Sequence, residues 1–367
     1  MAENPPKRLA IIKKKSMSIG NDTGASINFD SNGSNHRRKL TFIEVCAGAG
    51  GMSSGLIKAG FQPLLLNDID KNCCKTLEKN HPGCKIVCDS LLNLDLKEYK
   101  GNVDLLANGS PCQSFSLSGE RKGTDDPRGE LMPKFVELIE SVEPKIFLIE
   151  NVKGLLSHND GKTLEKIIAT LNRKGLYNIV YKLLNAVNYN VPQKRERVFI
   201  IGTLKTENIH FEYPNPENGI ITLEQVLKGV PDSAGAVYPA KRKEYFNLIP
   251  EGGCWINLPE DKQKEYLMSS FESGGGKRGI LRRLSWSEPS LTLLCTPSQK
   301  QTERCHPTET RPLKIREYAR IQTFPDSYEF VGSLASQYKQ IGNAVPVELA
   351  YRVGKSLINA LLSSSKI

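Results

Sequence analysis

The chain has 367 residues, 39% of them hydrophobic and 25% charged, which is the composition of a folded globular protein rather than of a disordered chain. No apolar run approaches the length of a transmembrane helix, and the basic, polar start lacks the apolar core of a secretory signal, so we expect a cytoplasmic protein. The formal net charge of +10 suits a polyanionic partner. Nine cysteines without a regular framework indicate a reducing compartment, and the absence of a Cys-x-x-Cys pair argues against a metal site.

Residues 1–38 are predicted to form a flexible basic arm. Lys and Arg are clustered there among Asn, Ser and Gly, and residues 21–35 contain few apolar side chains that could pack in a core. The cations could contact phosphates or form only a solvated tail, and the sequence leaves both readings open.

The stretch from Thr41 predicts the opening of a nucleotide-binding fold. Thr41–Cys46 predicts a strand, residues 47–51 a tight glycine turn, and Met52–Ala59 a helix that ends at Gly60. Strand, glycine turn and helix in this order begin a βαβ unit in which the backbone and the helix N-terminus approach a ligand closely. A purely structural turn is the alternative.

Two acids follow the next two predicted strands. Asp68 comes after the strand Gln62–Leu66 and lies 20 residues beyond Gly48, a spacing at which an acid can accept hydrogen bonds from ribose hydroxyls. The helix Lys71–Asn80 then leads to the strand Lys85–Cys88 and to Asp89, which could meet the edge of an adenine. The acid at this spacing makes the glycine turn a stronger indication of a cofactor site than the glycines alone.

Cys112 is the candidate nucleophile. The apolar run Val103–Ala107 predicts a buried strand, and Gly109 and Pro111 turn the chain directly after it. Cys112 is therefore expected on a loop at the carboxyl end of that strand, where ligands bind in open α/β sheets. A free cysteine is more often a small buried hydrophobe, but the Gly-, Ser- and charge-rich stretch 117–130 favours the reactive reading here.

Further polar groups are expected at the same edge. After a predicted helix at 131–142, the strand Lys145–Ile149 leads to Glu150, which could act on a ligand or simply form an ion pair or cap. A helix at 163–174 and a strand at 178–184 precede Arg195 and Arg197, which enter the strand Val198–Leu204. These arginines could contact phosphates and a polar base edge or form a solvated hairpin.

Beyond residue 204 the sequence becomes richer in Pro, Gly and Tyr, and its hydrophobic periodicity is weak. This predicts a second domain of irregular β structure and loops. From Lys277 to Arg320 the chain carries ten Lys and Arg against four Glu, either a nucleic-acid surface or a solvated face. His306 is predicted to be structural. A helix is expected over Arg311–Gln322, and an amphipathic helix closes the chain at about Leu362.

Taken together, these motifs resemble those of DNA (cytosine-5) methyltransferases of the prokaryotic restriction–modification type. The resemblance covers nearly all of Leu40–Leu362 in the family's motif order. It is carried by the glycine turn, by Gly109-Ser110-Pro111-Cys112-Gln113, by Glu150-Asn151-Val152, by Gln193-Lys194-Arg195-Glu196-Arg197 and by Gln340-Ile341-Gly342-Asn343. One departure is Cys46, where the family commonly has Phe, so an aromatic contact to the adenine is lost.

The resemblance implies an α/β fold: a Rossmann-like, mostly parallel sheet with helices on both faces, plus a smaller, irregular β-rich target-recognition domain. The expected domains are the arm (1–38), a catalytic and cofactor-binding domain (39–204), the target-recognition domain (205–332) and a C-terminal segment that returns to the catalytic domain (333–367).

The resemblance also implies the reaction and its residues. S-adenosylmethionine donates a methyl group to carbon 5 of a flipped-out cytosine, leaving S-adenosylhomocysteine, and no metal is expected. The catalytic residues are Cys112, which adds to carbon 6, and Glu150, Arg195 and Arg197. The cofactor residues are Cys46, Ala47, Gly48, Gly50, Gly51, Asp68, Ile69, Asp89, Ser90, Pro111, Leu131, Asn343 and Ala344. The DNA-binding residues are Ser116, Ser118, Arg121, Lys122, Arg128, Lys277, Arg278, Arg282, Arg283, Gln299 and Arg304.

The implied partner is double-stranded DNA with a short palindromic site, bound by a monomer associated with the nucleoid of a prokaryote. A cognate restriction endonuclease would belong to the same system without direct contact. Three alternatives stay open: a tRNA cytosine-5 methyltransferase, although the Cys-Phe-Thr tripeptide of that branch is absent; a non-catalytic DNA-binding regulator; and a nicotinamide dehydrogenase, which leaves the Pro-Cys loop unexplained.

Overall fold

A computed structural model describes residues 38–110, 130–272 and 279–364. By their contacts, residues Lys39–Ile367 form one unit and Met1–Arg38 another. The described residues thus leave out nearly all of the predicted basic arm (1–37), the stretch with Cys112 (111–129) and the basic loop at 273–278. None of the described helices is both long enough and apolar enough to cross a membrane.

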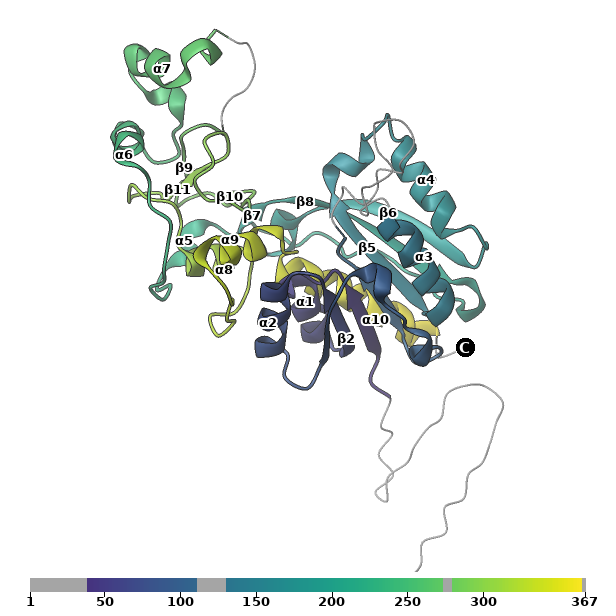
Figure 1. The fold of residues 1–367 in the computed structure, drawn as a ribbon. Helices are drawn as coiled ribbons and strands as arrows, with labels where there is room; N and C mark the ends of the chain where they lie inside the picture. The colour runs from purple at the N-terminus through teal and green to yellow at the C-terminus, as the bar shows by residue number, and fades with distance from the viewer. Residues whose placement is uncertain (1–37, 111–129, 273–278, 365–367) are drawn as a thin grey trace, which may run out of the picture. The chain divides into compact units, whose positions relative to one another are not determined.

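A seven-stranded sheet forms the centre of the fold, with the strand order β3-β2-β1-β4-β5-β8-β6 (Figure 1). Neighbouring strands from β3 to β5 run parallel, whereas β8 is antiparallel to both β5 and β6. The prediction of a mostly parallel α/β sheet is confirmed. The strands are β1 (Thr41–Val45), β2 (Gln62–Asp68), β3 (Lys85–Cys88), β4 (Leu105–Asn108), β5 (Ile146–Val152), β6 (Tyr177–Asn185) and β8 (Glu196–Leu204).

Helices cover both faces of this sheet, as predicted. Alternation along β1 sends Phe42 into the core shared with α1, α2 and α10, and Ile43 into the core shared with α3 and α4. A buried strand with two apolar faces is what a parallel sheet requires. The helices are α1 (Gly51–Ala59), α2 (Lys71–Asn80), α3 (Leu131–Val142), α4 (Lys162–Leu171) and α10 (Val347–Ser364).

The remaining elements are short. They are β7 (Gln193–Lys194), β9 (Arg282–Arg283), β10 (Ser290–Leu291), β11 (Arg304–Cys305), α5 (Leu223–Leu227), α6 (Ala240–Asn247), α7 (Glu260–Leu267), α8 (Ile315–Ile321) and α9 (Leu334–Asn343). Single 3₁₀ turns occur at Leu91–Asn93, Lys97–Tyr99, Lys153–Leu156, Ala186–Tyr189, Lys205–Glu207, Trp255–Asn257 and Met268–Ser270.

Strands beyond residue 204 do form small extra sheets, in which β11 pairs with β9 and β10 pairs with β7 from before residue 204, but each strand has only two residues. Among the described residues, helices α5, α6 and α7 occupy more of this region than strands do, so it is irregular as expected but less β-rich. The missed signals were local: Thr222 and Gln225 form a capping box at the start of α5, and prolines precede α6 and α7.

Several predicted boundaries also move, and two of these changes are explained by strand pairing. Helix α8 begins at Ile315 rather than at Arg311, because Pro312 is held in a β-bridge to Cys305. Strand β5 continues through Val152, so Glu150 lies inside a strand, opposite Phe199 of β8.

Candidate active site

Five chain segments bring polar groups to one edge of the sheet. The carboxyl ends of the parallel strands β1, β2, β4 and β5 meet there, and the antiparallel strand β8 contributes its amino end. The predicted cofactor turn, Asp68, Ser110, Glu150 and Arg197 all belong to these ends. Topology alone therefore gathers residues that are far apart in the sequence.

The turn between β1 and α1 is held in an unusual backbone shape. Cys46, Gly48 and Gly50 all have positive φ angles, of 53°, 57° and 79°. The Gly48 N–H donates to Asp68 Oδ2 at 2.7 Å, which ties the turn to the end of β2. A Cβ on Gly51 would lie 2.3 Å from the Val345 carbonyl oxygen, so only glycine allows α1 to start this close to the segment after α9.

The predicted cofactor acids lie at the ends of neighbouring strands. Asp68 also accepts a hydrogen bond from the Asp70 N–H, and burial raises the pKa of its carboxyl above the usual value. Asp89 is tied back to the same place, because Asn67 Nδ2 donates to its carbonyl at 2.8 Å. Between them, Ile69 leaves 71% of its surface exposed, an apolar platform beside the polar groups.

The segment that leads to Cys112 is anchored at its start. Ser110 is buried, its N–H donates to Asn108 Oδ1 at 2.8 Å, and its carbonyl accepts from Asn151 Nδ2 at 3.3 Å. Its hydroxyl donates to Cys46 Sγ at 3.7 Å, which connects it with the cofactor turn. Burial raises the pKa of Cys46 to about 12, so this thiol stays neutral. The chain thus leaves the described residues two positions before Cys112, beside the strand that carries Glu150.

Glu150 and Arg197 face each other across β5 and β8. Arg197 Nε lies 2.8 Å from Glu150 Oε1, and both side chains are nearly buried. Burial raises the pKa of Glu150, and the charges of Arg197 and Arg195 offset part of that rise. A carboxyl in this position can hold a proton closer to neutrality than an exposed glutamate can, while the arginine keeps it oriented.

Comparison with known proteins shows which family the chain matches. The family described as C-5 cytosine-specific DNA methylase matches residues 40–359. The chain belongs to this family. It is 49% identical over 330 residues to the Type II methyltransferase M.Eco47II of Escherichia coli, covering 88% of this chain and 79% of the relative. It is 46% identical to M.Sau96I of Staphylococcus aureus over 326 residues, covering 87% and 76%.

A solved structure agrees with these relatives. A DNA modification methyltransferase encoded within an E. coli prophage superposes with a TM-score of 0.66 at 26% identity, over 88% of this chain and 99% of that one. The predicted resemblance to restriction–modification cytosine-5 methyltransferases is therefore confirmed, and the chain is a DNA (cytosine-5) methyltransferase. The family uses S-adenosylmethionine in general.

Arg195 is buried and is held by backbone carbonyls. It is 1% exposed, and its guanidinium donates to the carbonyls of Leu293 (3.1 Å), Gly342 (2.8 Å) and Asn343 (3.5 Å). Burial and the charge of Arg197 lower its pKa well below the usual value for arginine. These contacts give Arg195 a structural role, its Nε has no partner among the described residues, and its catalytic role stays a prediction.

Other predicted cofactor residues lie around the same edge. Asn343 ends α9, and its Oδ1 accepts from the Cys295 thiol at 2.8 Å. Ala344 is buried close to Gly51. Leu131 begins α3 and is half-buried, and Pro111 lies outside the described residues.

The predicted DNA-binding residues divide into three groups. Arg283 and Arg304 are buried, and the Arg283 guanidinium donates to backbone carbonyls that include Phe246 (2.7 Å) and Ile249 (2.9 Å), so the structure gives no support to their base contacts, which stay predictions. Arg282 is partly exposed near Glu288, and Gln299 is exposed, so both stay candidates. The other seven lie outside the described residues: Ser116, Ser118, Arg121, Lys122, Arg128, Lys277 and Arg278.

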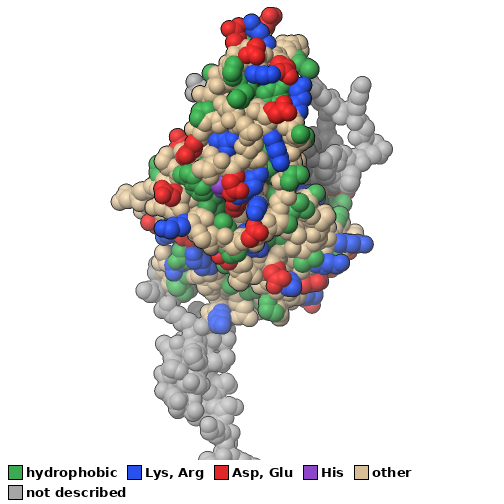
Figure 2. Space-filling view, turned by 90° about the vertical axis from the view of Figure 1, so that its left-hand side faces the viewer, with side chains coloured by type: hydrophobic (Ala, Val, Ile, Leu, Met, Phe, Trp, Pro, Cys, Tyr) green, Lys and Arg blue, Asp and Glu red, His purple; other side chains and the backbone are tan. Residues whose placement is uncertain are grey.

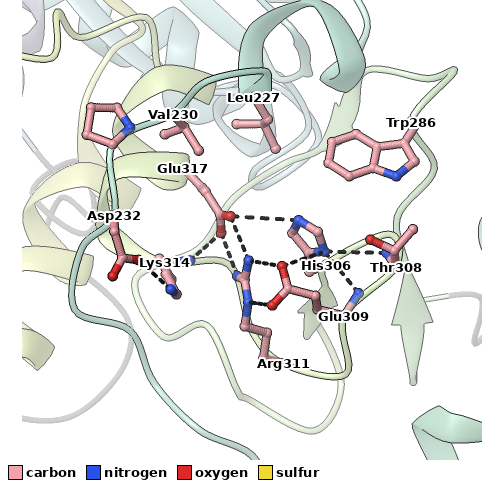
Figure 3. A pocket seen from close by; sticks show the side chains of 11 residues that line it. Leu227, Val230, Asp232, Trp286, His306, Thr308, Glu309, Arg311, Lys314 and Glu317 are labelled. Carbon is pink, nitrogen blue, oxygen red and sulfur yellow. Dashed lines mark hydrogen bonds and ion pairs between the residues drawn. The ribbon is translucent and has the colours of Figure 1, made fainter.

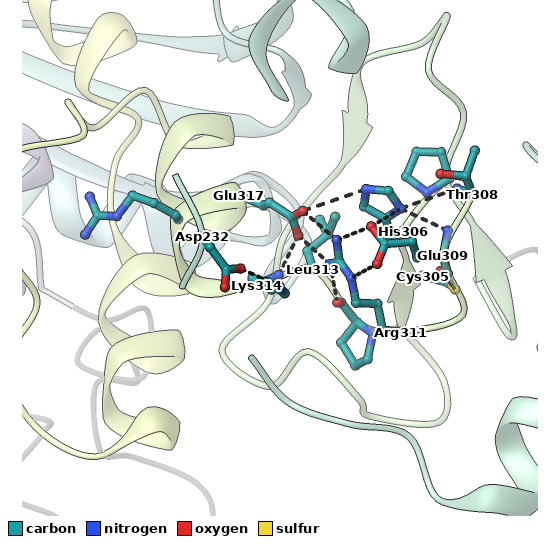
Figure 4. Close-up of polar contacts among 12 residues, drawn as sticks. Asp232, Cys305, His306, Thr308, Glu309, Arg311, Leu313, Lys314 and Glu317 are labelled. Atoms are coloured by element: carbon teal, nitrogen blue, oxygen red, sulfur yellow. Dashed lines mark hydrogen bonds and ion pairs between the residues drawn. The ribbon is translucent and has the colours of Figure 1, made fainter. Parts of the chain in front are cut away.

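Several of the cations counted between Lys277 and Arg320 form ion pairs with acidic side chains. Arg311 pairs with both Glu309 and Glu317 at 2.8 Å, and Lys314 pairs with Asp232 at 2.5 Å (Figure 4). Figure 2 shows a face on which Lys and Arg are interspersed with Asp and Glu. The local charge count therefore overstates the free positive charge among the described residues.

A cavity of about 370 Å³ lies beside this ion-pair cluster (Figure 3). Its lining includes Trp286, whose ring meets the buried His306 edge-on at 5.1 Å. His306 Nδ1 accepts from the Glu309 N–H at 3.1 Å, which fits the predicted structural role. None of the residues that line this cavity is a predicted cofactor or catalytic residue.

Glu44 was missed. It lies on β1 directly below the turn, is 1% exposed, and accepts a hydrogen bond from the Ser53 hydroxyl of α1. Burial and the nearby carboxyls Asp68 and Glu150 raise its pKa to about 8, and Ser53 offsets part of that rise. The one charged residue in an otherwise apolar strand was the available signal.

Proposed function

We propose that this enzyme methylates carbon 5 of a flipped-out cytosine within a specific duplex DNA sequence, through a covalent adduct between Cys112 and carbon 6. The observation that carries the proposal is the buried Glu150–Arg197 pair beside the anchored start of the Cys112 segment. A buried carboxyl oriented by an arginine at the sheet edge where the Cys112 segment begins supports a catalytic role over a purely binding one.

The residues at the sheet edge fit S-adenosylmethionine, which supplies an electrophilic methyl group when bound. A Cβ on Gly48 would meet nothing within 4 Å, so the backbone of the turn is open to a ligand there, and Asp68 can accept ribose hydroxyls on its remaining lone pairs. Ile69 offers an exposed apolar surface to an adenine, and Asp89 offers a carboxylate to its edge. The carboxyl groups gathered here also favour a cationic ligand.

The chain's own groups account for the activation of the cytosine. The Cys112 thiolate adds to carbon 6, and Glu150 donates a proton to ring nitrogen 3, so that carbon 5 becomes nucleophilic. Arg197 holds the carbonyl oxygen of the base and orients Glu150. After methylation a base, for which water suffices, removes the carbon 5 proton, the thiolate leaves, and the nitrogen 3 proton returns to Glu150.

The cytosine must leave the helical stack for these groups to reach it. We propose that residues 205–332 form the recognition domain that reads the DNA site, that 39–204 and 333–367 together form the catalytic domain, and that 1–38 is a separate basic arm. In a prokaryotic cytoplasm, methylation of a short palindromic site would protect the DNA against a cognate endonuclease.

Trapping on a fluorinated substrate tests this proposal. Duplex DNA that carries 5-fluorocytosine at the target site, together with S-adenosylmethionine, should give a denaturation-resistant protein–DNA complex, because fluorine cannot leave as a cation. Cys112→Ser should abolish the complex, since an alcohol stays protonated near neutral pH, while the half-buried Cys84→Ser serves as the matched control. An adduct that maps to another cysteine, or methylation of tRNA in place of DNA, would overturn the proposal.

A further inference from the structure

The carbonyl of Ala49, in the middle of the cofactor turn, accepts a hydrogen bond from a distant part of the chain. The donor is the Tyr328 hydroxyl, at 2.6 Å, from the segment between α8 and α9. The contact also explains why position 50 is glycine, since a Cβ there would lie 2.6 Å from this hydroxyl.

The Tyr328 ring is fixed on several sides. It is 5% exposed and packs against Phe324 and Phe330, with ring centroids 4.7 Å and 5.3 Å away. Arg316 on α8 donates to the Tyr328 carbonyl at 2.8 Å, which holds the backbone of the segment. A buried, packed tyrosine places its hydroxyl with little freedom to move.

His81 completes the arrangement from the end of α2. Its Nε2 lies 3.3 Å from the Tyr328 oxygen, and burial lowers the pKa of the ring to about 4, so the ring is neutral at neutral pH. The hydroxyl has one hydrogen, which goes to Ala49, so the His81 tautomer that fits carries its proton on Nε2 and donates it to the tyrosine oxygen. His81 thereby orients the hydroxyl toward the turn.

We infer that Tyr328 is a positioning residue that holds the Cys46–Gly51 turn in its cofactor-binding shape. The inference rests on the proposed role of that turn in binding S-adenosylmethionine. Tyr328 follows α8 in the region proposed to read DNA, so the shape of the cofactor site depends on a side chain from the recognition half of the protein. Its hydroxyl is already hydrogen-bonded to Ala49 and His81, so its effect should fall on cofactor affinity and leave chemistry unchanged.

Tyr328→Phe tests this inference, because it removes the hydroxyl and keeps the ring. Losing one hydrogen bond that shapes the turn should raise the Kd for S-adenosylmethionine about 3- to 10-fold, measured by calorimetry on the full chain. The KM for the cofactor should rise similarly, while kcat at saturating cofactor and the affinity for duplex DNA without cofactor stay within about twofold.

The chain offers a matched control in Tyr338→Phe. Tyr338 is also buried, lies in the same apolar cluster, and donates to a backbone carbonyl, that of Leu313, at 2.7 Å. Both variants should lower the melting temperature by similar amounts, and only Tyr328→Phe should weaken cofactor binding. Equal cofactor affinities in the two variants would overturn the inference.

Asp68→Asn separates this inference from the proposal on which it rests. If Asp68→Asn weakens cofactor binding and Tyr328→Phe does not, the turn binds the cofactor and the role of Tyr328 is wrong. If neither change alters cofactor binding, the cofactor site itself is misplaced and the inference falls with it.

Discussion

Replacing Glu44 by glutamine should change how the stability of the fold depends on pH. Glu44 is 1% exposed and accepts a hydrogen bond from the Ser53 hydroxyl, which a glutamine oxygen can also accept. Burial is the main reason that its pKa rises from 4.5 to about 8, with smaller contributions from Asp68 and Glu150. The substitution removes the titrating proton and keeps the size and the acceptor of the side chain.

The sign of this pH dependence follows from whether the folded or the unfolded protein binds the Glu44 proton more tightly. Between pH 4.5 and about 8 the folded protein retains a proton that the unfolded chain has released. The stability that Glu44 contributes is therefore fully present below pH 4.5 and is lost as the pH rises to about 8. At about 1.4 kcal/mol per pH unit, the loss between about pH 5 and pH 8 amounts to roughly 3–4 kcal/mol.

Urea unfolding at these two pH values measures the effect. The free energy of unfolding of Glu44→Gln, compared with that of the unchanged protein, should improve by roughly 3–4 kcal/mol from about pH 5 to pH 8. Glu78→Gln, at an exposed position on α2, serves as the control and should follow the unchanged protein at both pH values. A difference between Glu44→Gln and the unchanged protein that stays constant with pH would refute a protonated Glu44 in the folded state.

Four further outcomes are expected. Asp68→Asn should weaken S-adenosylmethionine binding by about 1–3 kcal/mol in calorimetry, and unchanged affinity would remove Asp68 from the site. The rate at saturating substrates should fall at high pH as the raised pKa of Glu150 is passed, and Glu150→Gln, slower throughout, should lose this fall because an amide does not titrate. Arg283→Lys should lower the free energy of unfolding by roughly 2–4 kcal/mol because buried carbonyls lose their donors, with no change in the salt dependence of DNA binding. The logarithm of the DNA-binding constant should fall with the logarithm of salt concentration with a slope of about −0.9 per phosphate contact, whereas a flat response would mean that the cations face solvent.

The central sheet could be predicted because its signals are local. Helices α2 and α3 have the predicted bounds, since each combines an apolar stripe with clear ends, and Asp70 caps α2 by accepting from the Asn72 N–H at 2.9 Å. The positions of Asp68 and Glu150 followed from the rule that ligands bind at the carboxyl ends of parallel strands. Beyond residue 204 the local signals mark only short elements, and the packing of those elements depends on distant contacts such as those of Arg283.

The sequence could not predict whether a given charged side chain points into the protein or toward solvent. Arg282 and Arg283 are neighbours on a two-residue strand, yet one is partly exposed near Glu288 and the other is buried among carbonyls. Strand alternation predicts that such neighbours point to opposite sides, but not which side is the interior. Tyr328 gave no signal at all, since its partner Ala49 lies 279 positions away in the chain.

The stretch from Gln193 to Arg197 shows how one motif divides between structure and chemistry. Gln193 Oε1 accepts from the Leu293 N–H at 2.9 Å, and its Nε2 donates at 3.0 Å to Gln322, whose own Nε2 donates to the Ile341 carbonyl at 2.7 Å. Arg195 binds the carbonyls of the same two distant segments, and only Arg197 pairs with Glu150. Buried amide and guanidinium groups are costly without hydrogen-bond partners, and apart from Arg195 Nε these two side chains find theirs on the two distant segments, so they join those segments together. Gln193 and Arg195 therefore hold the segments around the site together, whereas Arg197 pairs with Glu150 at the site itself.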